Sequence, residues 1–222
     1  NGQQGRISAK GLLYANLKGL DQRGGGVLVS EAGVTLDLNG GTLVNRDGGL
    51  IATPGALLLR QLGAVDNGAG GEISSDRAFT LAAASLDNRG GKVIGDSGLR
   101  LTVQRLLNQA KGVLAGRDGL SLDGGELFNG DGGRLDSQNS LSVSLGGVLD
   151  NQGGALVSEG SLTARAARLD NRGGTFSSAG ALALTSQAAL DNQGGRLLSD
   201  AGVTLKGASL DNSRSGVISA KG

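Results

Sequence analysis

Apolar residues recur along this chain in short alternating runs separated by glycine-rich turns. In the run 155–158, Leu156 is directed to one face and its neighbours to the other, as expected of a β-strand with a side-chain period of two. A second run, 161–164, follows a Glu-Gly turn, and a third run leads into Asn171. Each stretch of this kind therefore predicts three short strands and three corners.

The pattern repeats from one end of the chain to the other. The sequence Leu-Asp-Asn-Gln-Gly-Gly marks one corner at 149–154, and close variants of it recur throughout. With the asparagine as the marker and Gln22 filling one place, the ten intervals between Asn1 and Asn212 give a period of about 21 residues. We therefore predict an all-β parallel β-helix, or β-solenoid, of roughly ten to eleven coils that forms a single domain over residues 1–222.

Two apolar positions per coil are expected to line the interior as ladders. Because a single coil cannot bury its own apolar face, each coil depends on its neighbours, and stacking at about 4.8 Å predicts a rod on the order of 50 Å long. The strand after the glycines supplies Ile7, Leu28, Ile51, Ile73, Val93, Val113, Leu135, Leu156, Phe176, Leu197 and Val217, and the next strand supplies Leu12, Val34, Leu57, Phe79, Leu99, Leu120, Leu141, Leu162, Leu182 and Val203.

The corner asparagines are predicted to point inward and to form a structural ladder, not a ligand site. An inward polar side chain that has no partner costs about 1–3 kcal/mol, whereas amides stacked one coil apart can pair with each other. The predicted ladder consists of Asn45, Asn67, Asn88, Asn108, Asn129, Asn151, Asn171, Asn192 and Asn212.

The glycine pair after each asparagine predicts a tight turn, because glycine reaches positive φ without a steric penalty. Asn45, Asn67 and Asn129 are followed by one residue more than Asn88 or Asn151 before the strand resumes. The extra residue is expected to lie at the corner, so the period varies while the strands stay in register.

The composition of the chain argues against several classes of function. The formal net charge of +1 gives no basic face for nucleic acid, and no apolar run approaches the roughly 20 residues needed to cross a bilayer. The chain has no histidine and no cysteine, so a histidine-based triad, a thiolate nucleophile and the common zinc sites cannot be built. We predict no enzyme, no cofactor and no metal site.

Recurrent aspartates are the remaining candidates for chemistry. Asp66 and Asp87 occupy equivalent places in adjacent coils, and so do Asp150, Asp170, Asp191 and Asp211. Such a row could in principle bind a cation or resemble the acid cluster of a β-helical polysaccharide lyase. Because these residues alternate outward beside a corner, we interpret them as a solvated face.

One irregularity on that face suggests a contact site. The place before the corner asparagine is aspartate in seven coils, but Val44, Leu107 and Phe128 occupy it in three. Leu107 and Phe128 belong to consecutive coils, so stacking would put two apolar side chains next to each other on the outside. A covering loop or a local shift in register is the alternative explanation.

The repeated unit L-D-N-[RQ]-G-G-x-[LVI]-x-S resembles the filamentous haemagglutinin repeats of two-partner-secreted exoproteins of Gram-negative bacteria. The resemblance covers the entire chain. It implies a right-handed parallel β-helix, export through an outer-membrane transporter, and a place in a long fibre that is secreted or held at the cell surface. It carries over no catalytic residue.

The leading hypothesis is a rigid, non-catalytic stalk segment of a secreted adhesin or of a contact-dependent growth inhibition toxin-delivery protein. A lateral receptor- or glycan-binding segment at Leu107 and Phe128 is the alternative, and a polysaccharide lyase is the third. Since the chain starts within a repeat, we expect a fragment of a longer filamentous protein. Its open coil ends are expected to associate end to end.

Overall fold

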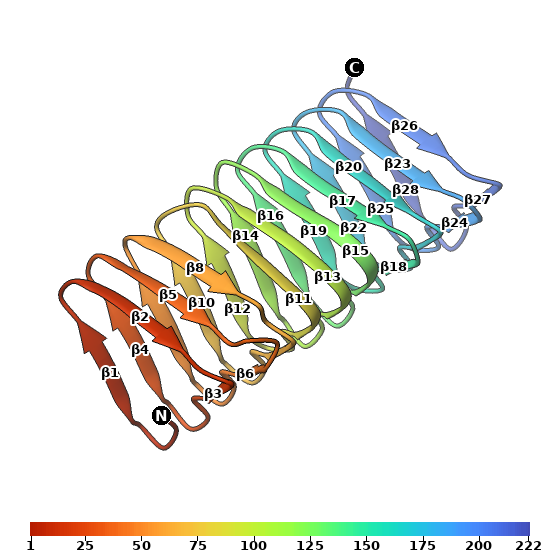
Figure 1. The fold of residues 1–222 in the computed structure, drawn as a ribbon. Coiled ribbons are helices and arrows are strands. Elements are labelled where there is room, and N and C mark those ends of the chain that lie inside the picture. Colours follow the sequence, from red (N-terminus) through yellow and green to blue (C-terminus); the bar gives the residue numbers. More distant parts are fainter.

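The computed structural model describes residues 1–222 as one elongated stack of flattened coils, with the two termini at opposite ends (Figure 1). All regular secondary structure is β, and no helix is long and apolar enough to cross a membrane. The 28 strands belong to three parallel sheets. The predicted all-β solenoid, with strands stacked about 21 residues apart along the chain, is confirmed.

The first sheet forms one long face and takes one strand from every coil, paired to the equivalent strand of the next coil, as when Leu156 pairs with Phe176. Its strands are β1 (Arg6–Ala9), β4 (Val27–Ser30), β7 (Leu50–Thr53), β10 (Glu72–Ser75), β12 (Lys92–Gly95), β14 (Val113–Gly116), β16 (Arg134–Ser137), β19 (Ala155–Ser158), β22 (Thr175–Ser178), β25 (Arg196–Ser199) and β28 (Val217–Ala220).

The opposite side of the coils is divided between two sheets. The small one contains β2 (Leu12–Asn16), β5 (Gly33–Asp37) and β8 (Ala56–Arg60). The large one contains β3 (Gly19–Asp21), β6 (Thr42–Val44), β9 (Ala64–Asp66), β11 (Phe79–Asp87), β13 (Leu99–Leu107), β15 (Leu120–Phe128), β17 (Leu141–Leu145), β18 (Val148–Asp150), β20 (Leu162–Ala166), β21 (Arg168–Asp170), β23 (Leu182–Ser186), β24 (Ala189–Asp191), β26 (Val203–Lys206) and β27 (Ser209–Asp211).

The three central coils depart from the predicted three strands. In β11, β13 and β15, each nine residues long, the second and third strands run together without a corner. Along β13 the side chains of Gln104 and Arg105 are both exposed, so the alternation shifts by one place before Leu106 turns inward. In β15, Gly124 takes the place opposite Val103, where a Cβ would lie 1.8 Å from the Val103 carbonyl oxygen. A bend within the strand therefore replaces a turn.

The core consists of 39 buried apolar residues, mostly leucine, that run the length of the stack. Three predicted inward residues are wrong. Leu12 is 81% exposed, because the pairing of β2 with β5 sets Leu13 opposite Val34. In β14, Leu114 and not Val113 pairs with Val93, and in β28 the inward place belongs to Ile218, not Val217.

The two errors in β14 and β28 share a cause, which is an additional residue in the preceding turn. Long turns place two successive residues at positive φ, as at Ala110 (54°) and Lys111 (64°) after Asn108, whereas short turns place only one there. Besides the three long turns predicted from sequence, those after Asn1, Gln22, Asn108 and Asn212 are long. The absence of a Gly-Gly pair at Asn108 hid the extra residue.

The two glycines of a short turn have different roles. Gly173 has a φ of 62° and open space around its Cα, so it supplies the left-handed conformation. Gly174 is not at positive φ, but a Cβ built on it would lie 2.0 Å from the carbonyl oxygen of Asn151 in the preceding coil. The second glycine is therefore required by the close approach of adjacent coils, which the explanation by positive φ alone did not anticipate.

We expect Gly174→Ala to lower the free energy of unfolding by about 3 kcal/mol or more, because the backbone must move away from the Asn151 carbonyl. Gly173→Ala, the matched control one residue earlier, is expected to cost about 1–2 kcal/mol, the strain of one left-handed alanine. Urea denaturation followed by circular dichroism measures both. An equal loss in the two variants would contradict the assigned roles.

Candidate contact surface and the corners that support it

The corner asparagines form a continuous chain of hydrogen-bonded amides inside the stack. From Asn1 to Asn192, the side-chain nitrogen (Nδ2 of asparagine, Nε2 of Gln22) donates to the side-chain oxygen of the next coil's amide, at distances of 2.6–3.0 Å. Every donor points toward the C-terminal end, so the amide dipoles are aligned and polarise one another. The members are Asn1, Gln22, Asn45, Asn67, Asn88, Asn108, Asn129, Asn151, Asn171, Asn192 and Asn212.

These amides also bind the backbone of their own corner and of the next. The Asn129 Nδ2 donates to the carbonyl oxygens of Gly133 (3.0 Å) and Ala155 (3.3 Å) as well as to Asn151. Asn129 and Asn151 have no exposed surface. With its donors and its oxygen both engaged, the amide ladder supports the corner and offers nothing to a ligand from outside.

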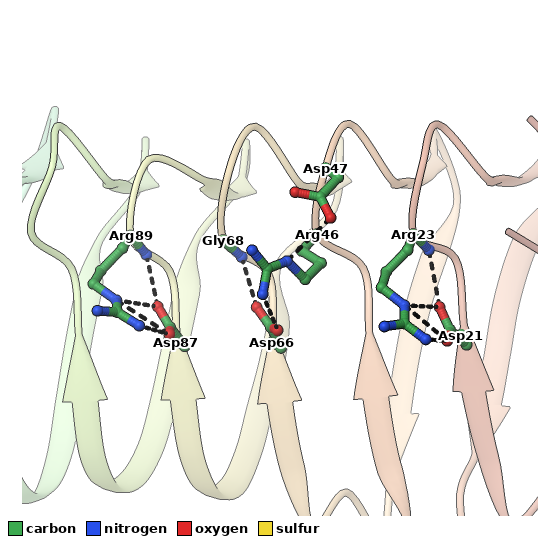
Figure 2. A network of polar contacts seen from close by, with 8 residues as sticks. All are labelled: Asp21, Arg23, Arg46, Asp47, Asp66, Gly68, Asp87 and Arg89. Atoms are coloured by element: carbon green, nitrogen blue, oxygen red, sulfur yellow. Dashed lines mark hydrogen bonds and ion pairs between the residues drawn. The ribbon is translucent and has the colours of Figure 1, made fainter. Parts of the chain in front are cut away.

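In the seven coils that have it, the aspartate before the corner amide residue closes the outer side of the corner. The Asp87 Oδ1 accepts hydrogen bonds from the backbone N–H of Arg89 (3.1 Å) and from its guanidinium Nε (2.9 Å). Figure 2 shows the same arrangement at Asp21 and Arg23, three coils earlier in the stack, with Arg46 between the two pairs. The aspartate is therefore a clamp on the turn, which the interpretation as a solvated face missed.

A regular feature of the sequence could have revealed this clamp. Arginine or glutamine follows the aspartate by two residues in most coils, and the Gln152 Nε2 donates to Asp150 in the way that Arg172 donates to Asp170. Asp170 is also wrongly assigned as solvated, since only 4% of it is exposed. The guanidinium groups of Arg168 and Arg172 lie 3.6 Å and 2.7 Å from its Oδ2.

The clamp changes the ionisation of its aspartates. Partial burial alone would raise the pKa of Asp87, but the hydrogen bonds from the side chain and backbone of Arg89 outweigh this effect and lower it from the usual 3.8. At Asp21 the hydrogen bond from the Arg23 side chain is the main cause of a lowered pKa. Both carboxylates therefore stay ionised at neutral pH, and both already accept hydrogen bonds from the arginine two residues on.

Leu107 and Phe128 break this row. They pair in register between β13 and β15, with Asp87 before them and Asp150 after them, and both are partly exposed. The Arg105 guanidinium lies 5.2 Å from the centroid of the Phe128 ring, within cation–π range. The structure therefore sets the two predicted contact residues next to each other, with a cation over the aromatic ring.

Polar groups surround the Leu107 and Phe128 pair, and one of them has no hydrogen-bond partner. The Arg105 guanidinium also lies 3.5 Å from the Glu126 carboxylate. A shallow hollow of about 290 Å³ beside Leu107 is lined by Ser85, Asp87 and Arg105 among others. Gln109 has no aspartate two residues before it, and its buried Oε1 accepts no hydrogen bond.

The other candidate carboxylates are held at their own corners. Asp66 and Asp87 lie opposite each other in adjacent coils, but Arg46 and Arg89 respectively hold them. No three carboxylates lie close enough to hold a metal ion. At the two ends of the first sheet, β1 and β28 pair with a strand on one side only, and end-to-end association through these open edges stays a prediction.

We expect Asn129→Ala to reduce the free energy of unfolding by roughly 2–4 kcal/mol, since it leaves the Asn108 donor and the Asn151 oxygen without their shared partner. Asn139→Ala is the control, because Asn139 is exposed and lies outside the ladder. Chemical denaturation of both variants measures the difference. A loss at position 129 no larger than at position 139 would show that the ladder contributes nothing to stability.

Replacing Arg89, which binds Asp87, should change how the free energy of unfolding depends on pH. Because the pKa of Asp87 is lowered in the folded state, its contribution is present above about pH 3.8 and is lost as the pH falls through the folded-state pKa. Arg89→Ala should move the pKa of Asp87 upward and lower stability at pH 7 by about 0.5 kcal/mol.

A carboxyl NMR titration of Asp87 tests this directly, and the stability difference should shrink under acid conditions. Arg77→Ala, at an exposed arginine without an ion pair, should leave the titration unchanged. An unaltered Asp87 pKa in Arg89→Ala would contradict the clamp.

The chain was compared with known proteins and families. No curated protein and no solved structure matches it. A model of the family described as Haemagglutinin repeat matches five segments, residues 1–61, 52–110, 105–153, 136–194 and 191–222. This is a structural and adhesin family of two-partner-secreted proteins. Because the five matches leave no residue uncovered, the chain belongs to the haemagglutinin repeat family along its whole length.

Proposed function

We propose that this protein is a non-catalytic, rigid stalk segment of a secreted filamentous adhesin or of a contact-dependent toxin-delivery protein. The observation that supports the proposal is the unbroken axial register: all eleven strands of the first sheet pair in sequence from β1 to β28. Each coil adds about 4.8 Å to the length. The role of the segment is to hold a distal element at a fixed distance from the producing cell.

Stiffness follows from hydrogen bonds that continue through the corners. The backbone N–H of Asn129 donates to the Asp150 carbonyl oxygen of the next coil at 2.7 Å, and Asn151 and Asp170 repeat the contact at 2.8 Å. The corners therefore bend only if these bonds and the amide ladder are broken together. Short corners also leave no inserted loops that could wall a catalytic groove.

We also propose how such a segment reaches its place. A parent protein of this family would cross the outer membrane of a Gram-negative bacterium through its partner transporter and would fold outside, secreted or at the cell surface. Since each coil contacts mainly its neighbours, folding can proceed coil by coil as the chain emerges. A chain without cysteine forms no disulfide that would have to be opened for this passage.

A lateral recognition surface is the second candidate. Leu107 and Phe128 favour it, because they replace the clamp aspartate with partly exposed apolar side chains next to the hollow at Ser85. A cell-surface receptor or glycan with an apolar face could pack against Phe128 and accept a hydrogen bond from Arg105. The other places in the row, apart from Val44, keep the aspartate that accepts the backbone N–H two residues on.

Binding of the fluorescently labelled protein to bacterial and epithelial cells separates the two candidates. A stalk predicts no saturable binding to either cell type, since length and not surface chemistry is its property. The double variant Leu107→Asp, Phe128→Asp is measured in parallel, with its β-rich circular dichroism checked first. For a stalk, the variant and the unchanged protein should give the same unsaturable background.

Leu198→Asp supplies the matched control, because Leu198 is a partly exposed outward residue of β25 on the first sheet. Saturable binding that is lost in the double variant and kept in the control would overturn the stalk as the sole role. It would establish the Leu107–Phe128 surface as a recognition site, and the cell type bound would distinguish host adhesion from toxin delivery.

A further inference from the structure

On β4 and β7 of the first sheet, the outward face carries a compact cluster of four apolar side chains. The outward residues of β4 are Val27 and Val29, and those of β7 are Leu50 and Ala52. Val27 pairs with Leu50 and Val29 with Ala52, so the four form a two-by-two square of partly exposed side chains, here called the apolar patch. Neighbouring apolar side chains on an outward sheet face can form a contact surface.

The strands on either side of the apolar patch carry opposite charges at equivalent places. On β1, Arg6 is an outward residue and Lys10 follows the strand, whereas on β10 these places are taken by Glu72 and Asp76. The register Arg6–Val27–Leu50–Glu72 runs straight across the four strands. None of the four charged residues has an ion-pair partner in the chain, although twelve other pairs form.

This arrangement is complementary to itself. A two-fold axis parallel to the strands, passing between β4 and β7, turns a second copy over and reverses its order of coils. Arg6 and Lys10 of one copy then face Glu72 and Asp76 of the other, and the same contacts repeat on the far side. We propose that two copies of this chain pair side by side, in antiparallel orientation, through the apolar patch and its charged borders.

The opposite orientation is disfavoured by the same charges. If the axis ran along the stack, the coils of both copies would be in the same order, and β1 would lie on β1 of the partner. Arg6 would then face the partner's cations, and Glu72 and Asp76 would face carboxylates, which opposes association. Charge therefore selects antiparallel pairing, while the apolar patch supplies the area.

The contact is small for a single pair of molecules. Four coils at about 4.8 Å by four residues at about 3.3 Å give a flat face of roughly 250 Å² per copy, against about 800 Å² per partner in a stable interface. Pairing is therefore expected at high protein concentration. It is also expected where stalks from two facing surfaces overlap laterally, because their effective concentration is then high. This inference concerns contacts between stalks and does not depend on a receptor.

Sedimentation equilibrium on the unchanged chain and on two charge variants tests the pairing. The acidic variant is Arg6→Glu, Lys10→Glu, and the basic variant is Glu72→Lys, Asp76→Lys. Each alone sets like charges against each other in the antiparallel pair, so its self-association should weaken by about tenfold or more. An equimolar mixture of the two restores every opposite-charge contact, so the mixture should associate about as tightly as the unchanged chain.

Arg196→Glu is the control, because Arg196 takes the place of Arg6 on β25, is exposed and has no ion pair. It should leave association unchanged. An unchanged chain that stays monomeric at about 1 mM would overturn the proposal. So would a mixture that associates no better than either variant alone, or association that neither variant weakens, which would indicate end-to-end contacts instead. Circular dichroism of each variant establishes that it is folded.

Discussion

The close axial approach of one coil to the next is the constraint on which the rest of this structure depends. Strand pairing sets the spacing of the coils along the whole axis, including the corners, where Asn129 donates through its backbone to the following coil. At that spacing there is no room for a side chain at the second glycine of the turn, as the distance from a Cβ on Gly174 to Asn151 shows. The same spacing brings the corner amides within hydrogen-bond distance. The close approach of the coils therefore requires glycine at the second position of the turn, and it lets the corner asparagines hydrogen-bond to each other.

Each corner satisfies its polar groups from two sides. Inside, the asparagine amide binds its neighbours and the backbone, so that a polar side chain with no exposed surface costs little. Outside, the aspartate accepts the backbone N–H two residues on, and an arginine or glutamine folds over it, as at Asp87 and Arg89. In the Leu-Asp-Asn-Arg sequence, the leucine packs in the core, the aspartate and arginine close the outer turn, and the asparagine joins the ladder. Coils without the aspartate keep the ladder, and their outer positions are free to take another role.

In the proposed stalk the regular coils and the departures from the repeat have different roles. The regular coils supply length and stiffness, and they present a largely polar outer surface with clamped carboxylates. Two places differ: the Leu107 and Phe128 pair on the large sheet, and the apolar patch around Val27 and Leu50 on the first sheet. They lie on different sheets of the stack, so the proposed contact with a target and the proposed contact between stalks would not compete. A single rigid segment can thereby combine a mechanical role with two separate surfaces.

The sequence by itself determined the fold class, the period, the inward leucine series and the inward place of the corner asparagines. These follow from a side-chain period of two and from a unit repeated often enough that its insertions stand out. The adjacency of Leu107 and Phe128 was also predictable, because both precede a corner asparagine in consecutive coils.

Only the tertiary structure decided the rest, and the physical reason is strand pairing between coils. Whether Leu12 or Leu13 points inward depends on which of them lies opposite Val34, and two adjacent leucines give no local preference. The long turn after Asn108 has no glycine at its left-handed places, so composition did not reveal it. The opposition of Arg6 to Glu72 across the apolar patch requires the register of four strands that are far apart in the sequence. The local sequence pattern determines the strands and turns of each coil, and strand pairing between coils determines their register.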